Sequence, residues 1–377
     1  MNKTINGLVP LYQDFLRDIS KIETPSENKA QLDRMVDFVE AFAKKRGFDT
    51  ERIPFEKSGD FLKISVKGTE ELPYVMFMAH MDTVHKIGAF GEGIIYEENG
   101  WLHGPGVMDC KGGIASSMLI METLRAENFK RPTVLLLTSD EEVGGKLSRE
   151  KGFDLIKSTA KGACAVFNGE PGTEKGITVG RKGIHHIKIN VTGKAAHAGN
   201  GYFDGASAIK EAANLLLKIE ALSSRDKCTF NCGLISGGTV SNAVPPMCEF
   251  HIDIRGKTVS DLEEAYEKVL EILKERTVPG TSCEVSTVSR RPPMECTKAN
   301  MELLGKINEA AKKLSQPELE PIFRGGGSDA AYTVIAGTPT VCSCGPVGLF
   351  EHSTNEKVLL SSLGPRAELI AEAAKLL

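Results

Sequence analysis

The chain lacks long hydrophobic runs, paired cysteine motifs and segments of a single charge sign. None of its apolar runs approaches the roughly 20 residues needed to cross a bilayer, and the opening "MNKTINGLVPLYQDFLRDISKIE" has no signal-peptide core. Its 46 basic and 50 acidic residues are mixed along the chain, with a net charge of −4. Because no basic stripe is present, nucleic acid is an unfavoured partner. We expect a cytoplasmic protein that binds neither membrane nor nucleic acid.

The nine cysteines are odd in number and scattered, and no CxxC occurs among them. This pattern favours small, reduced, mostly buried thiols over disulfides or thiolate metal ligands. The length of 377 residues allows two domains.

Short continuous apolar runs alternate with helical patterns in the first and last parts of the chain. The runs are "YVMFMAH" (74–80), "TVLLLTS" (133–139), "ACAVFNG" (163–169) and "TPTVCSCG" (338–345). Continuous runs are typical of strands buried on both faces. The pattern predicts an α/β domain with a mixed, mostly parallel sheet flanked by helices, formed by residues 1–180 and 293–377.

The middle of the chain follows another pattern. "GIHHIKINVTG" (183–193) alternates with period two, and helical and strand patterns then follow in the order βαββαβ. This order is that of the split βαβ unit in ferredoxin-like domains. We therefore expect an inserted α+β domain over residues 181–292.

Acidic residues and histidines follow each predicted buried strand. Ligand sites of open α/β sheets lie beyond the carboxyl ends of the strands, so these side chains are expected at one edge. They are His80 and Asp82 in "AHMDTVH", Asp140, Glu141 and Glu142 in "TSDEEVGG", Glu170 in "NGEPG", and Glu351 and His352 in "GLFEHSTNE". The glycine-rich loop "GPGVMDCKGGIA" adds Asp109.

Taken singly, each of these residues also fits an ordinary surface loop, but together they would repel one another unless cations were bound. Two histidines with carboxylates and no thiolates suit zinc or a similar divalent ion. The ligand count favours two ions, with Asp109 bridging, His80 and His352 on different ions, and Glu142 and Glu170 completing one set each.

Two of the remaining acids are assigned other roles in this hypothesis. Asp82 is suited to fix the tautomer of His80, and Glu141 is suited to act as the base for a bridging water.

The ordered motifs resemble those of the co-catalytic zinc carboxypeptidases, aminoacylases and deacylases. This group includes glutamate carboxypeptidase of the carboxypeptidase G type, acetylornithine deacetylase, succinyl-diaminopimelate desuccinylase and tripeptidase T. The resemblance covers nearly the whole chain. It is carried by "AHMDTV", "GPGVMDCKGG", "TSDEEVGG", "NGEP", "GKAAHAG", "GGTVSNAVP", "DIR", "GGGSDA" and "EHSTNE".

The resemblance implies a hydrolase with two Zn²⁺ ions per subunit, for which Co²⁺ or Mn²⁺ can substitute. The implied metal ligands are His80, Asp109, Glu142, Glu170 and His352. Glu141 is implied as the general base, Asp82 as the residue orienting His80, and the bond from Asp109 to Cys110 as a cis peptide. His197 is similar to a histidine that reaches into the partner's site, and 181–292 to a dimerisation and lid domain, so a homodimer is implied.

The resemblance also implies the substrate contacts, which are Asn242, Arg255, Arg324 and Gly326. Glu170, where relatives have Glu or Asp, favours carboxypeptidases and deacylases acting on small peptides or N-acyl amino acids. The glutamate carboxypeptidase branch carries an arginine two residues before its glycine triplet, whereas Arg324 directly precedes "GGGSDA". A di- or tripeptide aminopeptidase and an N-acyl amino acid deacylase therefore stay open, and a non-catalytic scaffold is disfavoured because every ligand and the base are present.

Overall fold

A computed structural model of the chain describes residues 2–91 and 93–377, which divide into two compact units. The larger unit comprises Met1–Val179, Cys296–Phe323 and Ser328–Leu377, and the smaller unit Gly180–Glu295 and Arg324–Gly327. The predicted division had placed residues 180, 293–295 and 324–327 in the α/β domain. Residues 324–327 belong to the smaller unit, where the Arg324 carbonyl accepts a hydrogen bond from the Lys182 N–H at 2.9 Å and the Gly325 carbonyl accepts one from Arg255 at 3.2 Å.

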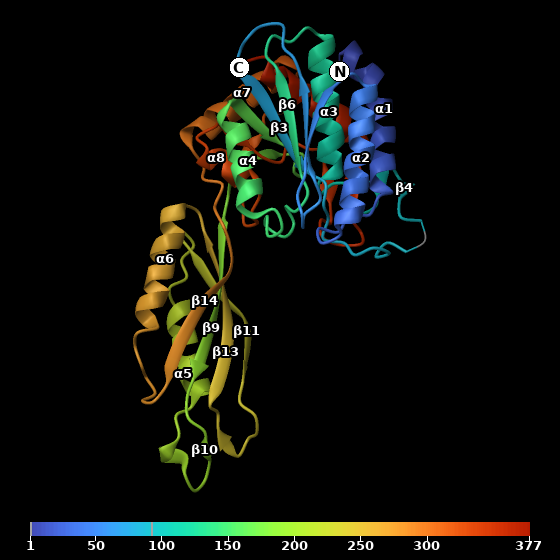
Figure 1. Cartoon of the computed structure of the whole chain (residues 1–377). Coiled ribbons are helices and arrows are strands. Elements are labelled where there is room, and N and C mark those ends of the chain that lie inside the picture. Colours follow the sequence, from blue (N-terminus) through green and yellow to red (C-terminus); the bar gives the residue numbers. More distant parts are fainter. Residues whose placement is uncertain (1, 92) are drawn as a thin grey trace. The chain divides into compact units, whose positions relative to one another are not determined.

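The larger unit is built on a mixed, mostly parallel sheet, as the sequence predicted, and this sheet has six strands (Figure 1). β3 pairs in parallel with β6 and β7, and β7 with β16, whereas β2 pairs antiparallel with β6 and β1. In spatial order the strands are β1 (Asp49–Ile53), β2 (Phe61–Val66), β6 (Thr133–Thr138), β3 (Tyr74–His80), β7 (Ala163–Asn168) and β16 (Thr340–Val341).

Helices cover both faces of this sheet, which explains why its central strands are continuously apolar. Phe77, Leu135 and Phe167 lie in the core cluster that includes residues of α1, α2, α3, α7 and α9, whereas Met76 and Leu136 pack on the opposite face toward α4 and α8. The helices are α1 (Lys3–Ser20), α2 (Lys29–Lys45), α3 (Lys111–Ala126), α4 (Arg149–Lys161), α7 (Lys298–Lys313), α8 (Ala330–Ile335) and α9 (Leu363–Ala374).

A second, four-stranded antiparallel sheet lies in the same unit. It consists, in spatial order, of β17 (Gly348–Leu349), β18 (Lys357–Leu359), β5 (Trp101–His103) and β4 (Tyr96–Glu98). The pairing of β18 with β5 brings the chain after residue 350 next to the chain before residue 104. Two further strands, β8 (Gly176–Arg181) and β15 (Glu320–Arg324), form a separate pair.

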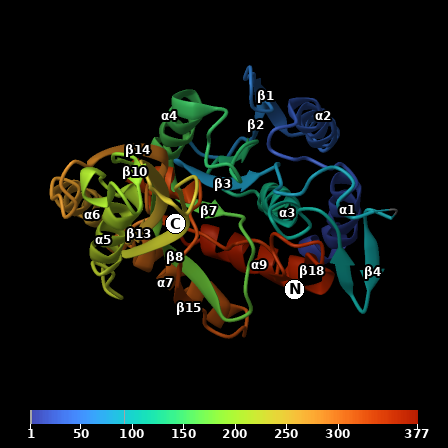
Figure 2. The same cartoon turned by 90° about the horizontal axis from the view of Figure 1, so that it is seen from below.

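The smaller unit has an antiparallel sheet in the order β11-β13-β9-β14, with two helices packed on one face (Figures 1 and 2). The order of elements is βαββαβ, interrupted by the short pair β10 and β12. The elements are β9 (Gly183–Thr192), β10 (Ala196–His197), α5 (Ala208–Glu220), β11 (Thr229–Gly237), β12 (Ala243–Val244), β13 (Met247–Gly256), α6 (Val259–Ile272) and β14 (Ser282–Arg291).

Across the described residues, 2–91 and 93–377, no helix combines the length and the apolar character that spanning a bilayer requires.

The close approach of α3 to the end of β7 depends on a glycine. A Cβ at Gly113 would lie 2.0 Å from the carbonyl oxygen of Gly169 and 2.8 Å from the Cys110 sulfur. We predict that Gly113→Ala lowers the free energy of unfolding by about 1–3 kcal/mol, because the helix must move away from the strand. Urea unfolding followed by circular dichroism measures this change.

The matched control is Gly305→Ala in α7, where a Cβ would meet no atom within 4 Å. Alanine in an open helix interior stabilises by about 0.5–1 kcal/mol relative to glycine, so this variant should gain stability. Equal stability of the two variants would contradict the packing argument.

Candidate metal centre

Three of the predicted site segments come from the carboxyl ends of adjacent parallel strands. His80 ends β3, Glu141 and Glu142 follow β6, and Glu170 follows β7. Because these strands are neighbours and run in the same direction, their following residues lie at one sheet edge.

His352 reaches the site by another route than the predicted one. The expected fourth strand over 338–345 is shorter, since β16 ends at Val341, and His352 lies in the turn between β17 and β18 of the second sheet. Asp109 lies between β5 and α3. The pairing of β5 with β18 therefore places the Asp109 loop and the His352 turn side by side.

Asp109 lies between the two histidines. One of its carboxylate oxygens is 3.0 Å from His80 Nε2, and the other is 3.3 Å from His352 Nε2. The peptide bond between Asp109 and Cys110 is cis, as the resemblance implied. His352 Nε2 also lies 3.2 Å from a carboxylate oxygen of Glu142.

The donor atoms form two groups that share Asp109. His80, Asp109 and Glu170 make one group and Asp109, Glu142 and His352 the other, with the donor atoms of each group all within 4.8 Å of one another. Imidazole nitrogens and carboxylate oxygens without a thiolate fit zinc and similar divalent ions. The Cys110 thiol belongs to neither group and donates a hydrogen bond to the Gly169 carbonyl at 3.1 Å.

The crowded acids respond differently to their surroundings. Burial and the charge of Asp109 raise the pKa of Glu142 to about 7. Burial alone would raise the pKa of Asp109 as well, but hydrogen bonds to His352 and His80 lower it. Hydrogen bonds to Asp109 and Glu142 raise the pKa of His352 to about 11. Of these two acids, Glu142 therefore has the raised pKa that crowding predicts. Asp109 does not, because it has an imidazole on each side.

Asp82 has more contacts than the sequence indicated. His80 Nδ1 lies 3.0 Å from the backbone carbonyl of Asp82 and 3.3 Å from its carboxylate, which accounts for an orienting role. The same carboxylate accepts the backbone N–H groups of Glu141 and Glu142 at 3.1 and 3.0 Å. It also accepts the Ser26 hydroxyl at 2.7 Å. Asp82 therefore joins the segment after β3 to the segment after β6.

Ser328 is a site residue that sequence reasoning missed. Its hydroxyl donates to the Glu170 carboxylate at 2.9 Å and accepts from the Asn168 side chain at 3.0 Å. The serine stands in the motif "GGGSDA", which was the available signal. Ser26 had no such signal, because no motif surrounds it.

His197 and Asn242 lie together in the smaller unit. His197 is in β10, which pairs with β12, and the Ala198 N–H donates to the Asn242 carbonyl at 3.0 Å. His197 Nδ1 accepts the N–H groups of Gly199 and Asn200, each at 3.1 Å. Since Nδ1 is an acceptor, a neutral ring carries its proton on Nε2.

The predicted substrate contacts Arg255, Arg324 and Gly326 also belong to the smaller unit. The guanidinium of Arg255 donates to both carboxylate oxygens of Asp253, at 2.6 and 3.0 Å, and to the Gly325 carbonyl. Arg324 ends β15, and Gly326 lies in the short segment after it.

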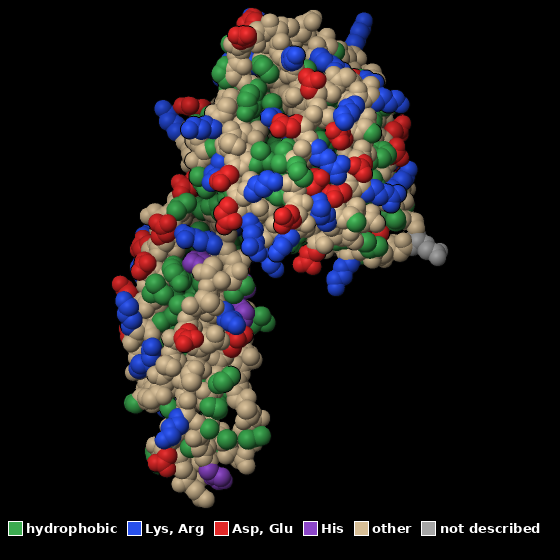
Figure 3. Space-filling view, viewed as in Figure 1, with side chains coloured by type: hydrophobic (Ala, Val, Ile, Leu, Met, Phe, Trp, Pro, Cys, Tyr) green, Lys and Arg blue, Asp and Glu red, His purple; other side chains and the backbone are tan. Residues whose placement is uncertain are grey.

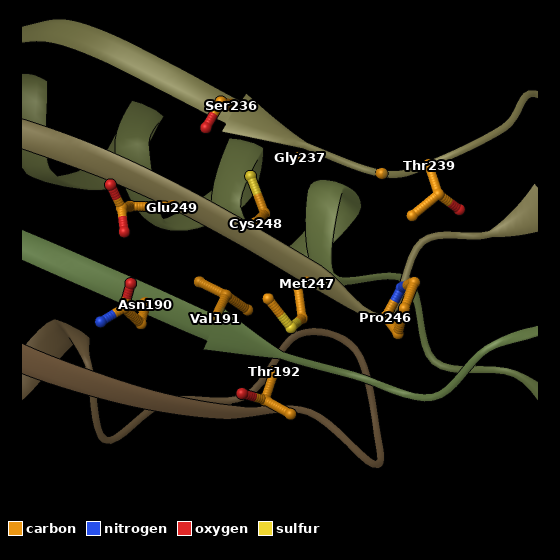
Figure 4. Close-up of a pocket in the computed structure, with 11 residues that line it drawn as sticks. Asn190, Val191, Thr192, Ser236, Gly237, Thr239, Pro246, Met247, Cys248 and Glu249 are labelled. Atoms are coloured by element: carbon orange, nitrogen blue, oxygen red, sulfur yellow. The ribbon is translucent and has the colours of Figure 1, made fainter.

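A cavity of about 580 Å³ opens elsewhere on the smaller unit, between residues 190–192, 236–239 and 246–249 (Figure 4). None of the predicted site residues lines it. Its charged lining residue, Glu249, is paired with Lys188 at 3.2 Å and His251 at 3.1 Å. On the face shown in Figure 3, acidic and basic side chains are interspersed, as the sequence composition led us to expect.

The fold and the paired donor groups define a class of metal-dependent hydrolases with an α/β domain and a second α+β unit. The sequence profile of peptidase family M20/M25/M40 matches residues 76–376, and the chain belongs to this family.

The names of similar proteins indicate both carboxypeptidases and aminopeptidases. Carboxypeptidase G2 of Pseudomonas sp. (strain RS-16) is 31% identical over 369 residues, covering 93% of this chain and 85% of the relative. The aminopeptidase PepT of Bacillus cereus has a similar structure, with a TM-score of 0.80 at 22% identity over 97% of both chains. The metallo-carboxypeptidase Sso-CP2 of Sulfolobus solfataricus has a TM-score of 0.75 at 16% identity, covering 100% of this chain and 99% of that chain.

The raised pKa of His352 predicts how the stability of the metal-free protein depends on pH. The folded value of about 11 lies above the ordinary 6.5, so the folded state holds a proton that the unfolded chain releases. The resulting stabilisation is complete below pH 6.5 and is lost progressively as the pH rises toward 11. The stability difference between chelator-treated wild type and His352→Asn should therefore narrow from pH 6 to pH 9.

Chemical unfolding of both proteins across this range measures that difference. A stability difference independent of pH would contradict the contact of His352 with the carboxylates of Asp109 and Glu142. Zn²⁺ should act in the opposite sense and stabilise more at pH 8 than at pH 6, because ion binding displaces protons from the ligands.

Proposed function

We propose that the protein is a dinuclear zinc hydrolase that cleaves an amide bond, as a glutamate-carboxypeptidase-like enzyme acting on small peptides or N-acyl amino acids. The observation that carries this proposal is the pair of donor groups sharing Asp109. The 31% identity to a carboxypeptidase over 93% of the chain supports the choice among amide hydrolases.

In this proposal five residues hold the ions: His80, Asp109, Glu142, Glu170 and His352. Bound ions of this kind polarise a carbonyl oxygen and make a water molecule acidic near neutral pH. The protein contributes their placement. Asp82 holds His80 and the backbone of Glu141 and Glu142, and Ser328 holds Glu170.

Glu141 is the proposed general base. It is adjacent to Glu142 in the chain and buried, and its backbone is tied to Asp82. It would accept the proton of the attacking water as the carbon–oxygen bond forms. It would then return this proton to the leaving amine as the carbon–nitrogen bond breaks, which restores the carboxylate for the next cycle.

His197 is the proposed donor to the tetrahedral oxyanion. Its Nδ1 accepts two backbone N–H groups, which leaves the Nε2–H to donate to developing negative charge. We propose that it acts in the site of a second subunit, in a homodimer formed through residues 181–292. Asn242, adjacent to His197, would bind the same substrate region.

Arg255, Arg324 and Gly326 are proposed to contact the terminal carboxylate of the substrate. A guanidinium binds a carboxylate through two parallel hydrogen bonds.

A substrate panel tests the proposed activity. After zinc loading, the protein is assayed with acyl-glutamates, dipeptides, tripeptides, acetylornithine and succinyl-diaminopimelate, and bound metal is counted by elemental analysis. We expect cleavage that requires a free C-terminal carboxylate. A requirement for a free N-terminal amine would identify an aminopeptidase instead, and absence of both metal and turnover would indicate a scaffold.

Glu141→Gln tests the proton transfer. The amide is isosteric but cannot accept the proton, so turnover should fall by about 10²–10⁴-fold. Metal content should be unchanged, because Glu141 belongs to neither donor group. Full activity of this variant would exclude Glu141 as the base.

Mixing this variant with His197→Ala tests the shared site. His197→Ala alone should lower turnover without releasing metal, and a mixed dimer would contain one site with both native residues. We therefore expect the mixture to be more active than either variant alone. If mixing restored no activity, His197 would not act in the site of the partner subunit.

A further inference from the structure

Glu356 is a buried acid that the proposed reaction does not use. Its side chain is 1% exposed, although it lies only four residues after His352. A carboxylate removed from water is costly unless hydrogen bonds or counter-charges replace the lost hydration. The contacts of Glu356 therefore indicate why the acid is there.

One carboxylate oxygen of Glu356 accepts the backbone N–H groups of Met108 and Asp109, each at 3.0 Å. The other oxygen accepts the Gly106 N–H and lies 3.0 Å from His85 Nε2. In addition, the backbone carbonyl of Glu356 accepts the Gly104 N–H at 3.3 Å. One residue thus receives four backbone donors from the loop that ends at Asp109.

Lys111 holds the same loop through its carbonyl groups. Its ammonium group is fully buried and donates to the carbonyl oxygens of Pro105 at 2.9 Å and Ile22 at 2.8 Å. The N–H groups of the loop therefore donate hydrogen bonds to a buried acid, and one of its carbonyl groups accepts a hydrogen bond from a buried base. A loop rich in glycine loses more conformational freedom on folding than other loops do, so such contacts are needed to fix it.

Glu356 also joins segments that carry different donor groups. His85 lies five residues after His80, at the end of the segment that holds His80 and Asp82. Glu356 itself continues the turn that holds His352, and its backbone N–H donates to the Ser353 carbonyl at 3.0 Å. The carboxylate is consequently the point where the segments of His80, Asp109 and His352 meet.

We propose that Glu356 is a positioning residue for the metal centre: by binding the backbone of residues 106–109 and the ring of His85, it sets where the Asp109 carboxylate lies between His80 and His352. This role rests on the proposed function. Residues that orient metal ligands typically change metal affinity or activity by about 10–100-fold when altered.

The first test is Glu356→Gln. In glutamine an NH₂ group replaces one of the two carboxylate oxygens and cannot accept a hydrogen bond from the N–H groups that it faces. The backbone of Met108 and Asp109, or of Gly106, must therefore move. We expect Zn²⁺ affinity, measured by competition with a chromophoric chelator, to fall by about 10–100-fold, and kcat to fall with little change in KM.

The matched control is Glu211→Gln in the smaller unit. Glu211 is also fully buried and accepts backbone N–H groups, from Thr277 at 3.1 Å and Val278 at 2.7 Å, two residues that lie in the smaller unit and not in a segment with a predicted ligand. The Glu211→Gln variant should have a lower thermal stability than the unsubstituted protein and the same Zn²⁺ affinity. If both variants lost stability and neither lost affinity, Glu356 would be a purely structural acid and the proposal would be wrong.

Glu356→Asp provides a second test should the glutamine variant fail to fold. It keeps the charge but is one methylene shorter, so its carboxylate cannot reach His85 and all three backbone N–H groups of Gly106, Met108 and Asp109, and Zn²⁺ affinity should again fall. Unchanged affinity in a folded aspartate variant would overturn the proposal. Absence of bound zinc in the unsubstituted protein would instead refute the proposed function, which separates the two failures.

Discussion

The Asp109 carboxylate lies between His80 and His352, and each of its oxygens contacts one imidazole. This shared position is the constraint on which the site depends, because both donor groups contain Asp109. A carboxylate used on both sides has little freedom to move without weakening one contact. The loop that carries Asp109 must therefore be fixed. Glu356 accepts hydrogen bonds from its N–H groups, and Lys111 donates a hydrogen bond to one of its carbonyl groups.

The fold meets this constraint by joining two sheets. Parallel strands of the six-stranded sheet end together and deliver His80, Glu142 and Glu170 to one edge. The second sheet delivers Asp109 and His352 through the pairing of β5 with β18. Asp82 links the first set internally, since its carboxylate holds the backbone after β6.

Local sequence patterns predicted most elements because burial on both faces leaves a clear signal. The run 74–80 coincides with β3, and the alternating run 183–193 contains β9. The predicted strand over 338–345 was too long, since pairing with β7 continues only through Val341. The hairpin that carries His352 has strands of two and three residues, too short for a periodic pattern.

The sequence by itself determined the chemical types at the site, because imidazoles and carboxylates following buried strands have few other uses in such numbers. It also determined that Asp109 lies in a loop of unusual backbone freedom. Only the tertiary structure decided which groups meet. The contacts of Asp82 with the β6 segment, of Ser328 with Glu170 and of Glu356 with the Asp109 loop join residues 59 to 250 positions apart. Such pairs have no local signature, since the packing of separate segments alone brings them within hydrogen-bonding distance.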